Sequence, residues 1–582
     1  MNKRWLQELM TPQNFVFYFF YPLFDEMGVT DHRTLDWAVG MNPGEEAEKE
    51  LALYFHIPFC DDPCNMCMYT KQKKQDGVDR IRFIKAMKEE IVRQKNIIRG
   101  KTIKAIYIGG GTPTALSVEE IKYLLNELFD GLRQCKEYET SFDIIKELEE
   151  LTFECHPQSD ELAEKIMEVS KFLDDKEKPG SGKEKLRISI GIQSANDEII
   201  KLVRHTSSKN KTDYSFLDAV KIVQDFSPLA GKVNVDFMFG IQKPAITEVK
   251  LNKVSQEWAE NCEEFKSFLP EYLRGRVEIK SKDDEFALRM YGIPAKIKNG
   301  EKLSDEYSFI QKWIKEYNQE VQFGSPILIE EGFKQNDDKI KLEEELDKII
   351  KCFNRNSYGN IGFTFYQLWG GKGRTSGPVK GMPLFLNTPK EIEEQRKLIF
   401  EKLSEKKYEI DYDSLWIQKS KNNDQHCIYH EFMYENKNYL GFGPSAYGYY
   451  NGVTYKNLDE IKEYKNELLE NNGLPLKYLE VLDDDDIEFR NIVLSLKWPI
   501  NKQKENKLRV TKQSNIDILS KLQKTAPEMI VFDEDKKETK YPVLTDDGGL
   551  HVNELCMLMT YIKQDKNMAL RQAEIRLMKE IH

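Results

Sequence analysis

The sequence lacks the long hydrophobic run and the leader that membrane and secreted proteins carry. The aromatic run from Phe15 to Phe24 is about half the length of a membrane span. We therefore predict no membrane span and an arm packed on the main domain, with an anchor for a membrane or a partner as the alternative. The first ten residues carry Lys3, Arg4 and Glu8, and no cleavage site follows, which argues against a secretory signal. The nine cysteines are an odd number without a paired framework, so the cytoplasm is the expected compartment.

The chain also lacks an excess of basic residues. It has 86 Lys and Arg against 98 Asp and Glu, a net charge of -12. Phosphate binding needs a concentrated basic surface, so a nucleic-acid partner is disfavoured, including the tRNA of a modifying enzyme. A small anionic substrate held by a local arginine pocket is compatible with this charge. The length of 582 residues predicts about two to four domains, and internal repeats and low-complexity linkers are absent.

Three cysteines stand close together in LALYFHIPFCDDPCNMCMYTK, residues 51–71. Cys60, Cys64 and Cys67 form a CxxxCxxC pattern after a run that is typical of a buried strand. Three thiolates on one short loop can face a common point, and soft sulfur ligands suit an iron–sulfur cluster. A [4Fe-4S] cluster has four irons, so three cysteines leave one iron open to a further ligand. A zinc loop or three unrelated thiols are the alternatives, but no second zinc knuckle lies nearby.

Strand-like and helix-like runs alternate after this loop. The predicted strands are LALYFHIP, KAIYIGGGTP, LTFECHP, LRISIGIQS, KVNVDFMFG and, later, IGFTFYQLW. A helix is predicted from about Arg80 to Asn96, and Ser117 with Glu120 predicts a capping box for the next one. The pattern predicts an α/β fold, a partial parallel (β/α)6 TIM-type barrel whose active site lies at the carboxyl ends of the strands. His56, on the first strand, is interpreted as a satisfied core residue rather than an acid or base.

The chain changes character after Gly240. The segment from about residue 245 to residue 336 is polar and far longer than an ordinary connection between a strand and a helix. This length indicates a large insertion, which is either a decorative subdomain or a lid over the active site. The last portion, with an acidic helix start at 483–486 and a hairpin before a terminal helix, predicts a small, mostly helical C-terminal domain. We therefore expect an arm at 1–48, a core at 49–240, the insertion at 241–336, the end of the barrel at 337–370, an accessory substrate-covering region at 371–480 and the small domain at 481–582.

The cysteine loop, with YFHIPFC before its second cysteine and GGGTP after it, resembles the radical S-adenosylmethionine (SAM) enzymes. The branch it resembles contains oxygen-independent coproporphyrinogen III oxidase and its heme-chaperone and C-methylating relatives. In that family SAM chelates the open iron, and one electron cleaves it to a 5'-deoxyadenosyl radical. The resemblance therefore implies a [4Fe-4S] cluster held by Cys60, Cys64 and Cys67, SAM as a cofactor, and a reductant such as flavodoxin or ferredoxin.

The resemblance also implies which residues contact SAM, each at the end of a predicted strand. The family's positions fall on Tyr54, on Gly110, Gly111 and Thr112 of the glycine turn, on Glu154, on Gln193 and, near the ribose, on Asp236. The family places an arginine where this chain has His205. The neighbouring Arg204 is assigned to the SAM carboxylate, because a guanidinium binds a carboxylate bidentately. No residue is assigned a catalytic role.

Two hypotheses follow for the function. The leading one is a radical enzyme that acts on a tetrapyrrole or another small organic substrate, by C-methylation, ring opening or oxidative decarboxylation. The competing one is a heme chaperone that keeps the cluster and carries heme without turnover. LGFGPSAYGYY resembles the chaperone-like relatives, and His426 and His430, at helical spacing, are candidate axial ligands with two surface histidines as the alternative. Tyr69, where the oxidase often has a further cysteine, counts against the authentic oxidase, and Met66 replaces an aromatic residue of many relatives.

Overall fold

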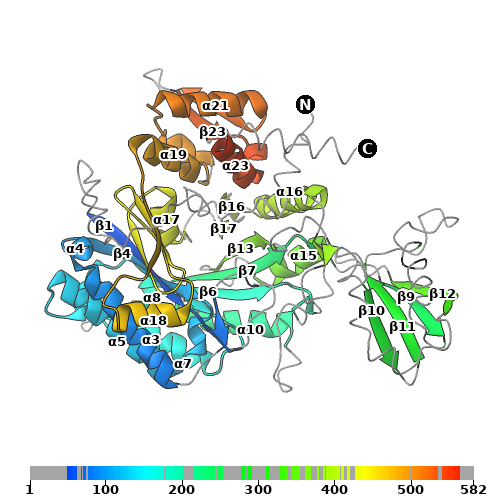
Figure 1. Ribbon diagram of the computed structural model, residues 1–582, viewed down its shortest axis with the longest axis horizontal. Helices are drawn as coiled ribbons and strands as arrows, with labels where there is room; N and C mark the ends of the chain where they lie inside the picture. Colours follow the sequence, from blue (N-terminus) through cyan, green and yellow to red (C-terminus); the bar gives the residue numbers. More distant parts are fainter. Residues whose placement is uncertain are drawn as a thin grey trace.

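The structure is a computed structural model of the 582-residue chain (Figure 1). The residues that it describes are 49–61, 67, 70–73, 77–175, 178–197, 199–200, 214–242, 246–252, 277–282, 285–291, 308, 310, 312, 328–336, 342–353, 361–368, 377–378, 385–386, 389–406, 408–411, 416–419, 426–498, 500–534 and 540–563. The predicted arm at 1–48 lies outside them.

A twelve-stranded sheet forms the centre of the molecule. Its middle consists of six strands in which each adjacent pair is parallel: β1 (Glu50–Ile57), β4 (Thr102–Gly110), β5 (Glu150–Cys155), β6 (Leu186–Gln193), β7 (Lys232–Phe239) and β13 (Ile361–Gln367). They lie in chain order, and their carboxyl ends meet at one edge. The mixed α/β fold with a largely parallel sheet is thus confirmed. The division into a six-unit barrel and a helical C-terminal domain stays a prediction.

The sheet continues beyond the parallel strands on both sides. β18 (Tyr439–Phe442) adds to β1 in parallel. The remaining strands are antiparallel to their neighbours, namely β19 (Tyr447–Tyr450), β20 (Val453–Asn457) and β21 (Leu476–Val481) beside β18, and β17 (Trp416–Lys419) and β16 (Tyr408–Asp411) beside β13. Because β1 pairs with β18 and β13 pairs with β17, the described sheet is open.

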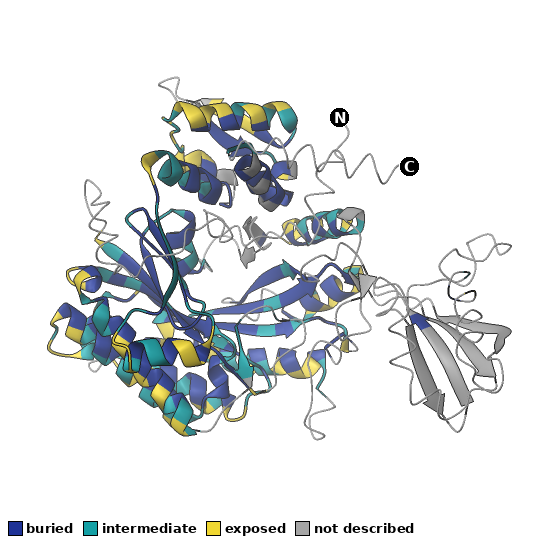
Figure 2. Cartoon of the chain, in the orientation of Figure 1, coloured by how far each residue is buried: buried dark blue, intermediate teal, exposed yellow. Residues whose placement is uncertain are grey.

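Helices cover one face of the sheet (Figure 1). They are α3 (Gly77–Arg93), α4 (Lys95–Ile98), α5 (Val118–Lys136), α6 (Ser141–Glu147), α7 (Leu162–Phe172), α8 (Gly182–Lys185), α10 (Phe216–Phe226) and α15 (Leu342–Cys352), with short 3-10 turns at Pro113–Ala115 and Ser227–Leu229. Alternate strand residues such as Leu53, Ile108 and Phe153 belong to one buried apolar core with these helices. Figure 2 shows the resulting layer of buried strands and half-exposed helices.

Helix α5 begins as its sequence predicts. The Ser117 side chain accepts a hydrogen bond from the Glu120 backbone N–H, and the Glu120 carboxylate accepts one from the Ser117 backbone N–H at 2.9 Å. Arg80 on α3 adds an ion pair to Glu120 at 2.7 Å. The capping box is confirmed, and it also ties two neighbouring helices together.

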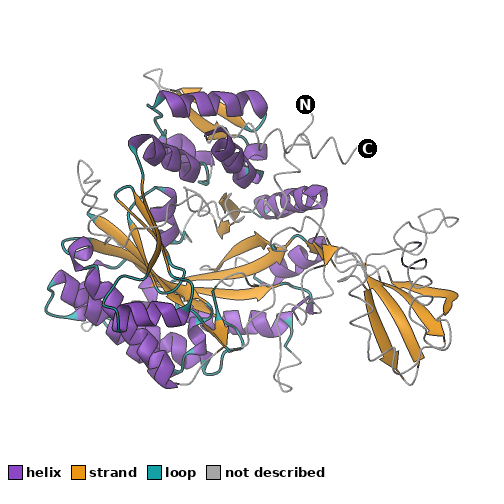
Figure 3. Ribbon diagram, in the orientation of Figure 1, coloured by secondary structure: helices purple, strands orange, loops and turns teal. Residues whose placement is uncertain are grey.

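Two smaller sheets follow β7. β8 (Ile241–Gln242), β15 (Phe385–Leu386) and β14 (Gly377–Pro378) form a short three-stranded sheet. β9 (Ile246–Asn252), β10 (Val277–Lys282), β11 (Glu285–Tyr291) and β12 (Leu328–Asn336) form an antiparallel sheet that lies to one side of the main sheet (Figures 1 and 3). This four-stranded sheet falls within the predicted insertion.

The later helices are α16 (Pro389–Glu405), α17 (Ile428–Tyr434), α18 (Ile461–Leu469), α19 (Asp484–Ser495), α20 (Ile500–Asn506), α21 (Gln513–Thr525), α22 (Asp546–Leu550) and α23 (Val552–Lys563), with the hairpin β22 (Ile530–Glu534) and β23 (Lys540–Leu544) between them. Of these helices, α18 lies beside α3, whereas α19, α21 and α23 lie together at the other end of the molecule (Figure 1). The predicted acidic helix start and the predicted hairpin are confirmed. Among the helices of the described ranges, none has the length and apolar character of a membrane span.

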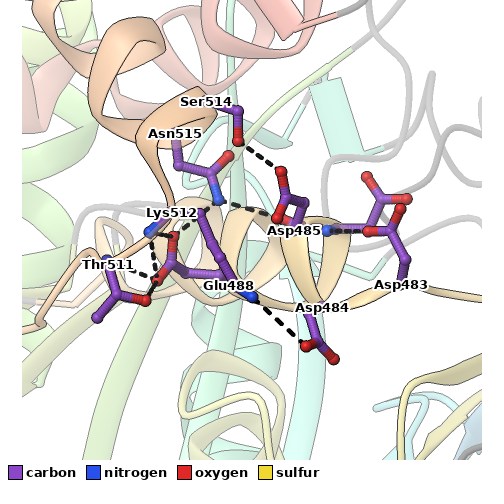
Figure 4. Close-up of polar contacts among 9 residues, drawn as sticks. Asp483, Asp484, Asp485, Glu488, Thr511, Lys512, Ser514 and Asn515 are labelled. Carbon is purple, nitrogen blue, oxygen red and sulfur yellow. Dashed lines mark hydrogen bonds and ion pairs between the residues drawn. The ribbon is translucent and has the colours of Figure 1, made fainter.

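Acidic side chains of helix α19 form hydrogen bonds with the start of helix α21 (Figure 4). The Glu488 carboxylate accepts hydrogen bonds from the backbone N–H groups of Thr511 and Lys512 and from the Asn515 amide. Asp485 accepts one from the Ser514 hydroxyl. A carboxylate placed at a helix amino terminus satisfies N–H groups that lack a partner within the helix. The acidic run therefore has a structural role in this domain.

Candidate functional site

The face of the sheet opposite the helices is polar. Residues that alternate with the apolar core positions point to this inner face, because successive side chains of a strand point to opposite sides. The inner-face residues of the six parallel strands include Tyr54, His56, Tyr107, Glu154, Arg187, Ser189, Gln193, Asn234, Asp236, Thr364 and Tyr366. All the described SAM-contact candidates except the glycine turn are in this set, so the structure brings them to one surface.

The cysteine loop is closed at its base by a short parallel ladder. β2 (Phe59–Cys60) pairs with β3 (Gln72–Lys73), and the Gln72 N–H donates to the Pro58 carbonyl at 2.7 Å. Within the loop, the Lys71 ammonium donates to the Cys67 carbonyl at 2.5 Å. Cys60 is buried, whereas Cys67 is partly exposed. Cys64, Met66 and Tyr69 lie outside the described residues.

The glycine turn packs directly against the start of this loop. The Gly111 N–H donates to the Ile57 carbonyl and the Thr112 N–H to the Phe59 carbonyl, both at 2.8 Å. A Cβ on Gly111 would lie 2.8 Å from the Phe59 oxygen and 3.1 Å from the Cys60 sulfur. The Thr112 hydroxyl lies 3.6 Å from the same sulfur. The glycine is therefore required by the close approach of the cysteine loop, and this close approach places the Cys60 sulfur beside the glycine turn and Thr112.

Gly110 has a different requirement. Its φ is +113°, and a Cβ there would lie 2.8 Å from the His56 Nδ1. Gly100, with φ of +76°, has nothing within 4 Å of such a Cβ. Both glycines have a positive φ, but only at Gly110 would an added Cβ clash with a neighbour. Substituting each in turn therefore separates the cost of the positive φ from the cost of the steric clash.

We expect Gly110→Ala to destabilise the protein by about 3 kcal/mol and Gly100→Ala by about 1 kcal/mol, as measured by chemical denaturation. Both variants place a side chain at positive φ, but only the first collides with an imidazole. Equal losses in the two variants would contradict this assignment, because they would show that His56 moves aside freely.

His56 is fixed by both ring nitrogens. Nε2 lies 2.9 Å from the Thr70 carbonyl and must donate to it, so in the neutral ring Nδ1 accepts from the Tyr54 hydroxyl at 3.0 Å. Burial lowers the His56 pKa to about 4, which keeps the ring neutral near pH 7. The interpretation of His56 as a satisfied core residue is confirmed. Through Thr70 it holds the returning end of the cysteine loop.

Glu154 lies next to the glycine turn. Its carboxylate accepts hydrogen bonds from the Tyr107 hydroxyl at 2.7 Å and from the Gly110 N–H at 3.0 Å. Burial raises the Glu154 pKa to about 7, and the charge of Asp236 adds to the effect. A carboxylate has about four lone-pair positions, so two of them remain for a ligand with N–H donors such as an ammonium group.

Asp236 and Gln193 lie on the next strands of the same face. Asp236 accepts from the Ser189 hydroxyl at 3.1 Å and from the Asn234 amide at 2.7 Å, and burial raises its pKa. Gln193 has a φ of +81° at a register shift in β6, and its side-chain oxygen accepts from the Tyr366 hydroxyl. These hydrogen bonds orient the Asp236 carboxylate and the Gln193 side-chain amide on the inner face of the sheet. Arg204 lies outside the described residues.

The opposite, amino end of the inner face is covered by helix α17. The Glu150 carboxylate accepts from the Ile428 N–H at 3.0 Å and pairs with Lys232 at 2.9 Å, and Lys232 also donates to the His426 carbonyl at 2.7 Å. Cys427, the residue before the helix, is buried against Thr152 at 3.8 Å. A segment from the second half of the chain therefore forms a floor under the candidate site.

The predicted helical spacing of His426 and His430 is wrong. The helix begins at Ile428 with Cys427 as its N-cap, so His426 lies before the helix, where its carbonyl accepts from Lys232. The His426 ring packs edge-on against Trp498 at 5.7 Å, and the His430 ring stacks on Tyr107 at 5.6 Å. Burial lowers the His430 pKa to about 3, and the charge of Arg187 contributes. The two rings thus pack in different surroundings.

Sequence reasoning missed several inner-face residues. Tyr107 bonds to Glu154, Ser189 bonds to Asp236, and Tyr366 bonds to Gln193. The available signal was the period of two along each strand, because these residues share the parity of the predicted contacts. Arg187, buried on the same face, follows the same parity; burial opposes its charge, but Glu150 and Asp236 are among the groups that hold its pKa above the ordinary value.

Comparisons with known proteins agree with this geometry. Residues 54–243 match the model of the Radical SAM superfamily. The heme chaperone HemW of Buchnera aphidicola subsp. Acyrthosiphon pisum is 27% identical over 198 residues, which cover 34% of this chain and 45% of that protein. The oxygen-independent coproporphyrinogen III oxidase of Escherichia coli K12 is 26% identical over 198 residues, 34% of this chain and 36% of that enzyme. The chain thus spans less than half the length of each of these relatives.

A solved structure is also similar. Coproporphyrinogen III oxidase (HemN) from Escherichia coli, described as a radical SAM enzyme, has a TM-score of 0.48 and 17% identity over 94% of this chain and 97% of that one. The resemblance drawn from the cysteine loop and the glycine turn is confirmed by the family model and the relatives. Residues 54–243 of this chain therefore match the Radical SAM superfamily, and the relatives that this part of the chain resembles are a heme chaperone and an oxygen-independent coproporphyrinogen III oxidase.

Proposed function

We propose that this chain is a radical SAM protein with a [4Fe-4S] cluster on Cys60, Cys64 and Cys67. When bound, the cluster and SAM would supply a 5'-deoxyadenosyl radical after reduction by a donor such as flavodoxin or ferredoxin. The observation that supports the proposal most directly is the fit between the Gly111 turn and Cys60. The missing side chain lets the cysteine loop approach the turn closely, so the Cys60 sulfur lies beside Gly111 and the Thr112 hydroxyl.

The residues of the inner face would hold SAM in distinct ways. Glu154 keeps acceptor positions open next to Gly110, where an amino group would bind. Asp236, oriented by Ser189 and Asn234, would accept hydrogen bonds from the ribose hydroxyls. Tyr54, Gln193 and Arg204 complete the proposed set, with Arg204 assigned to the SAM carboxylate.

The substrate class follows from the relatives. Their names concern heme and coproporphyrinogen, so we propose a tetrapyrrole as substrate or cargo. Turnover would be C-methylation, ring opening or oxidative decarboxylation. The second candidate, a heme chaperone without turnover, is favoured by LGFGPSAYGYY. This segment lies beside the cysteine loop, since the Ser445 and Thr70 hydroxyls are 2.5 Å apart.

One anaerobic experiment tests the proposal and separates the two candidates. Reconstituted protein is incubated with dithionite, methyl-labelled SAM, and either heme or coproporphyrinogen, and the products are followed by mass spectrometry. We expect 5'-deoxyadenosine in every reaction, with labelled or decarboxylated tetrapyrrole if the chain is an enzyme. Stoichiometric heme binding without a tetrapyrrole product supports the chaperone. A protein that holds neither iron nor sulfide after reconstitution contradicts both.

A further inference from the structure

A buried arginine on helix α19 stands outside the candidate site. Arg490 is 1% exposed. Its Nη2 donates to the Tyr439 hydroxyl at 3.1 Å, and its guanidinium carbon lies 4.4 Å from the centre of the Tyr449 ring. In the part of the chain that the structure describes, no group accepts a hydrogen bond from its Nε or Nη1. The side chain therefore has unused N–H donors in a region closed to solvent.

The charge of Arg490 is not balanced by the groups that it touches. A guanidinium does not lose its proton in a protein. Burial raises the pKa of Tyr439 even though Arg490 opposes the shift, and burial also raises the pKa of Tyr449. Both phenols are therefore neutral near pH 7. Tyr449 offers only the face of its ring, a weaker partner than an anion.

The neighbouring acidic residues of helix α19 form their hydrogen bonds and ion pairs with groups other than Arg490. Glu488 and Asp485 bond to the start of α21, as Figure 4 shows. Asp486, one turn before Arg490, forms an ion pair with Lys563 at 2.8 Å. Among the described residues none supplies a carboxylate to Arg490. Buried charges in proteins are normally paired, because their desolvation is strongly unfavourable.

We propose that a small monovalent inorganic anion, of the size and charge of chloride, binds at the guanidinium of Arg490. The single cationic charge calls for one negative charge, and the free Nε and Nη1 groups supply the donors. The enclosing side chains of Tyr439 and Tyr449 favour a compact ion over an organic acid. Tyr439 pairs with Ala52 near the start of β1, so this site lies toward the amino end of the strand, away from the cysteine loop. The inference does not depend on the proposed function.

Wild-type protein tests the inference without any variant. Thermal unfolding is measured in sodium chloride, in sodium bromide and in sodium gluconate at equal ionic strength. We expect higher midpoints in both halides, with a dependence on halide concentration that saturates, since a ligand of the native state stabilises it by mass action. In crystals grown with bromide, we expect an anomalous peak at the Arg490 guanidinium.

Variants then assign the effect to this side chain. Arg490→Met is expected to abolish the difference between halide and gluconate. Arg82→Met, which removes a half-exposed arginine paired with Glu470, is expected to keep the difference. If Arg490→Met does not fold, the bromide peak in the wild type decides. Equal midpoints in all three salts, or a water or a carboxylate of the chain in place of the bromide, would overturn the proposal.

Discussion

Cys60→Ala is expected to lose the cluster and the cleavage of SAM together. Of the two proposed ligands that lie within the described residues, Cys60 is the one that packs against both the glycine turn and Thr112. Changing a residue that only orients a metal ligand lowers affinity or activity about 10- to 100-fold. Removing the ligand itself should exceed that range. We expect iron and sulfide content to fall to background and 5'-deoxyadenosine formation to drop more than about a hundredfold.

The matched control for this variant is Cys352→Ala. Cys352 ends helix α15 and is partly exposed, and it lies far along the chain from the cysteine loop. We expect this variant to keep the wild-type iron content and the wild-type rate. If Cys60→Ala also keeps them, Cys60 is not a ligand. If the wild type itself fails to cleave SAM, the proposed function is wrong instead.

Much of the sheet could be predicted because its signals are local. Each parallel strand is a short apolar run with a polar or glycine end, as in KAIYIGGGTP. The Ser117–Glu120 box and the acidic start at 483–486 are also local: the box forms as predicted, and a helix begins at the acidic run. The candidate contacts Glu154 and Asp236 follow from strand ends for the same reason. Carboxyl ends of parallel strands meet at one edge, so residues far apart in sequence can be grouped there from the pattern alone.

The floor and the outer strands could not be predicted in this way. β18 pairs with β1, and α17 covers the inner face through contacts with Glu150 and Lys232. Both arrangements join the first half of the chain to its last third, and no local period records such a pairing. The same limit applies to His426, whose carbonyl accepts a long-range hydrogen bond from Lys232 just before helix α17 begins.

Glu90 shows how such a long-range contact is held. This fully buried residue of helix α3 accepts hydrogen bonds from the Gly443 N–H at 2.9 Å, the Asn457 amide at 2.6 Å and the Tyr464 hydroxyl at 2.5 Å. Gly443 packs closely against β1, because a Cβ on Gly443 would lie 2.6 Å from the His56 carbonyl oxygen. The Glu90 carboxyl group thus joins helix α3 to the segment LGFGPSAYGYY, residues 440–450, whose strand β18 pairs with β1.

Glu90→Ala is expected to lower the free energy of unfolding strongly and in a pH-dependent way. Three buried donors lose their acceptor, each at a cost of about 1–3 kcal/mol, so we expect a loss of about 4 kcal/mol at pH 5. Burial raises the Glu90 pKa from 4.5 to about 7. A raised pKa in the folded state gives the wild type a stability that is present below pH 4.5 and lost as the pH rises through 7. The wild type loses about 1.4 kcal/mol of stability per pH unit between pH 5 and pH 7. The difference in free energy of unfolding between the wild type and Glu90→Ala should therefore shrink to about 1 kcal/mol at pH 8.

Chemical denaturation of both proteins from pH 5 to pH 8 measures this difference, and Glu89→Ala supplies the control. Glu89 is the preceding residue of the same helix and is exposed, so its variant should stay within about 0.5 kcal/mol of the wild type at every pH. A Glu90→Ala deficit that does not change with pH would mean that the buried carboxyl does not titrate in this range. A small deficit at pH 5 would mean that water replaces the carboxyl group, and the link between α3 and the second half of the chain would then rest on packing alone.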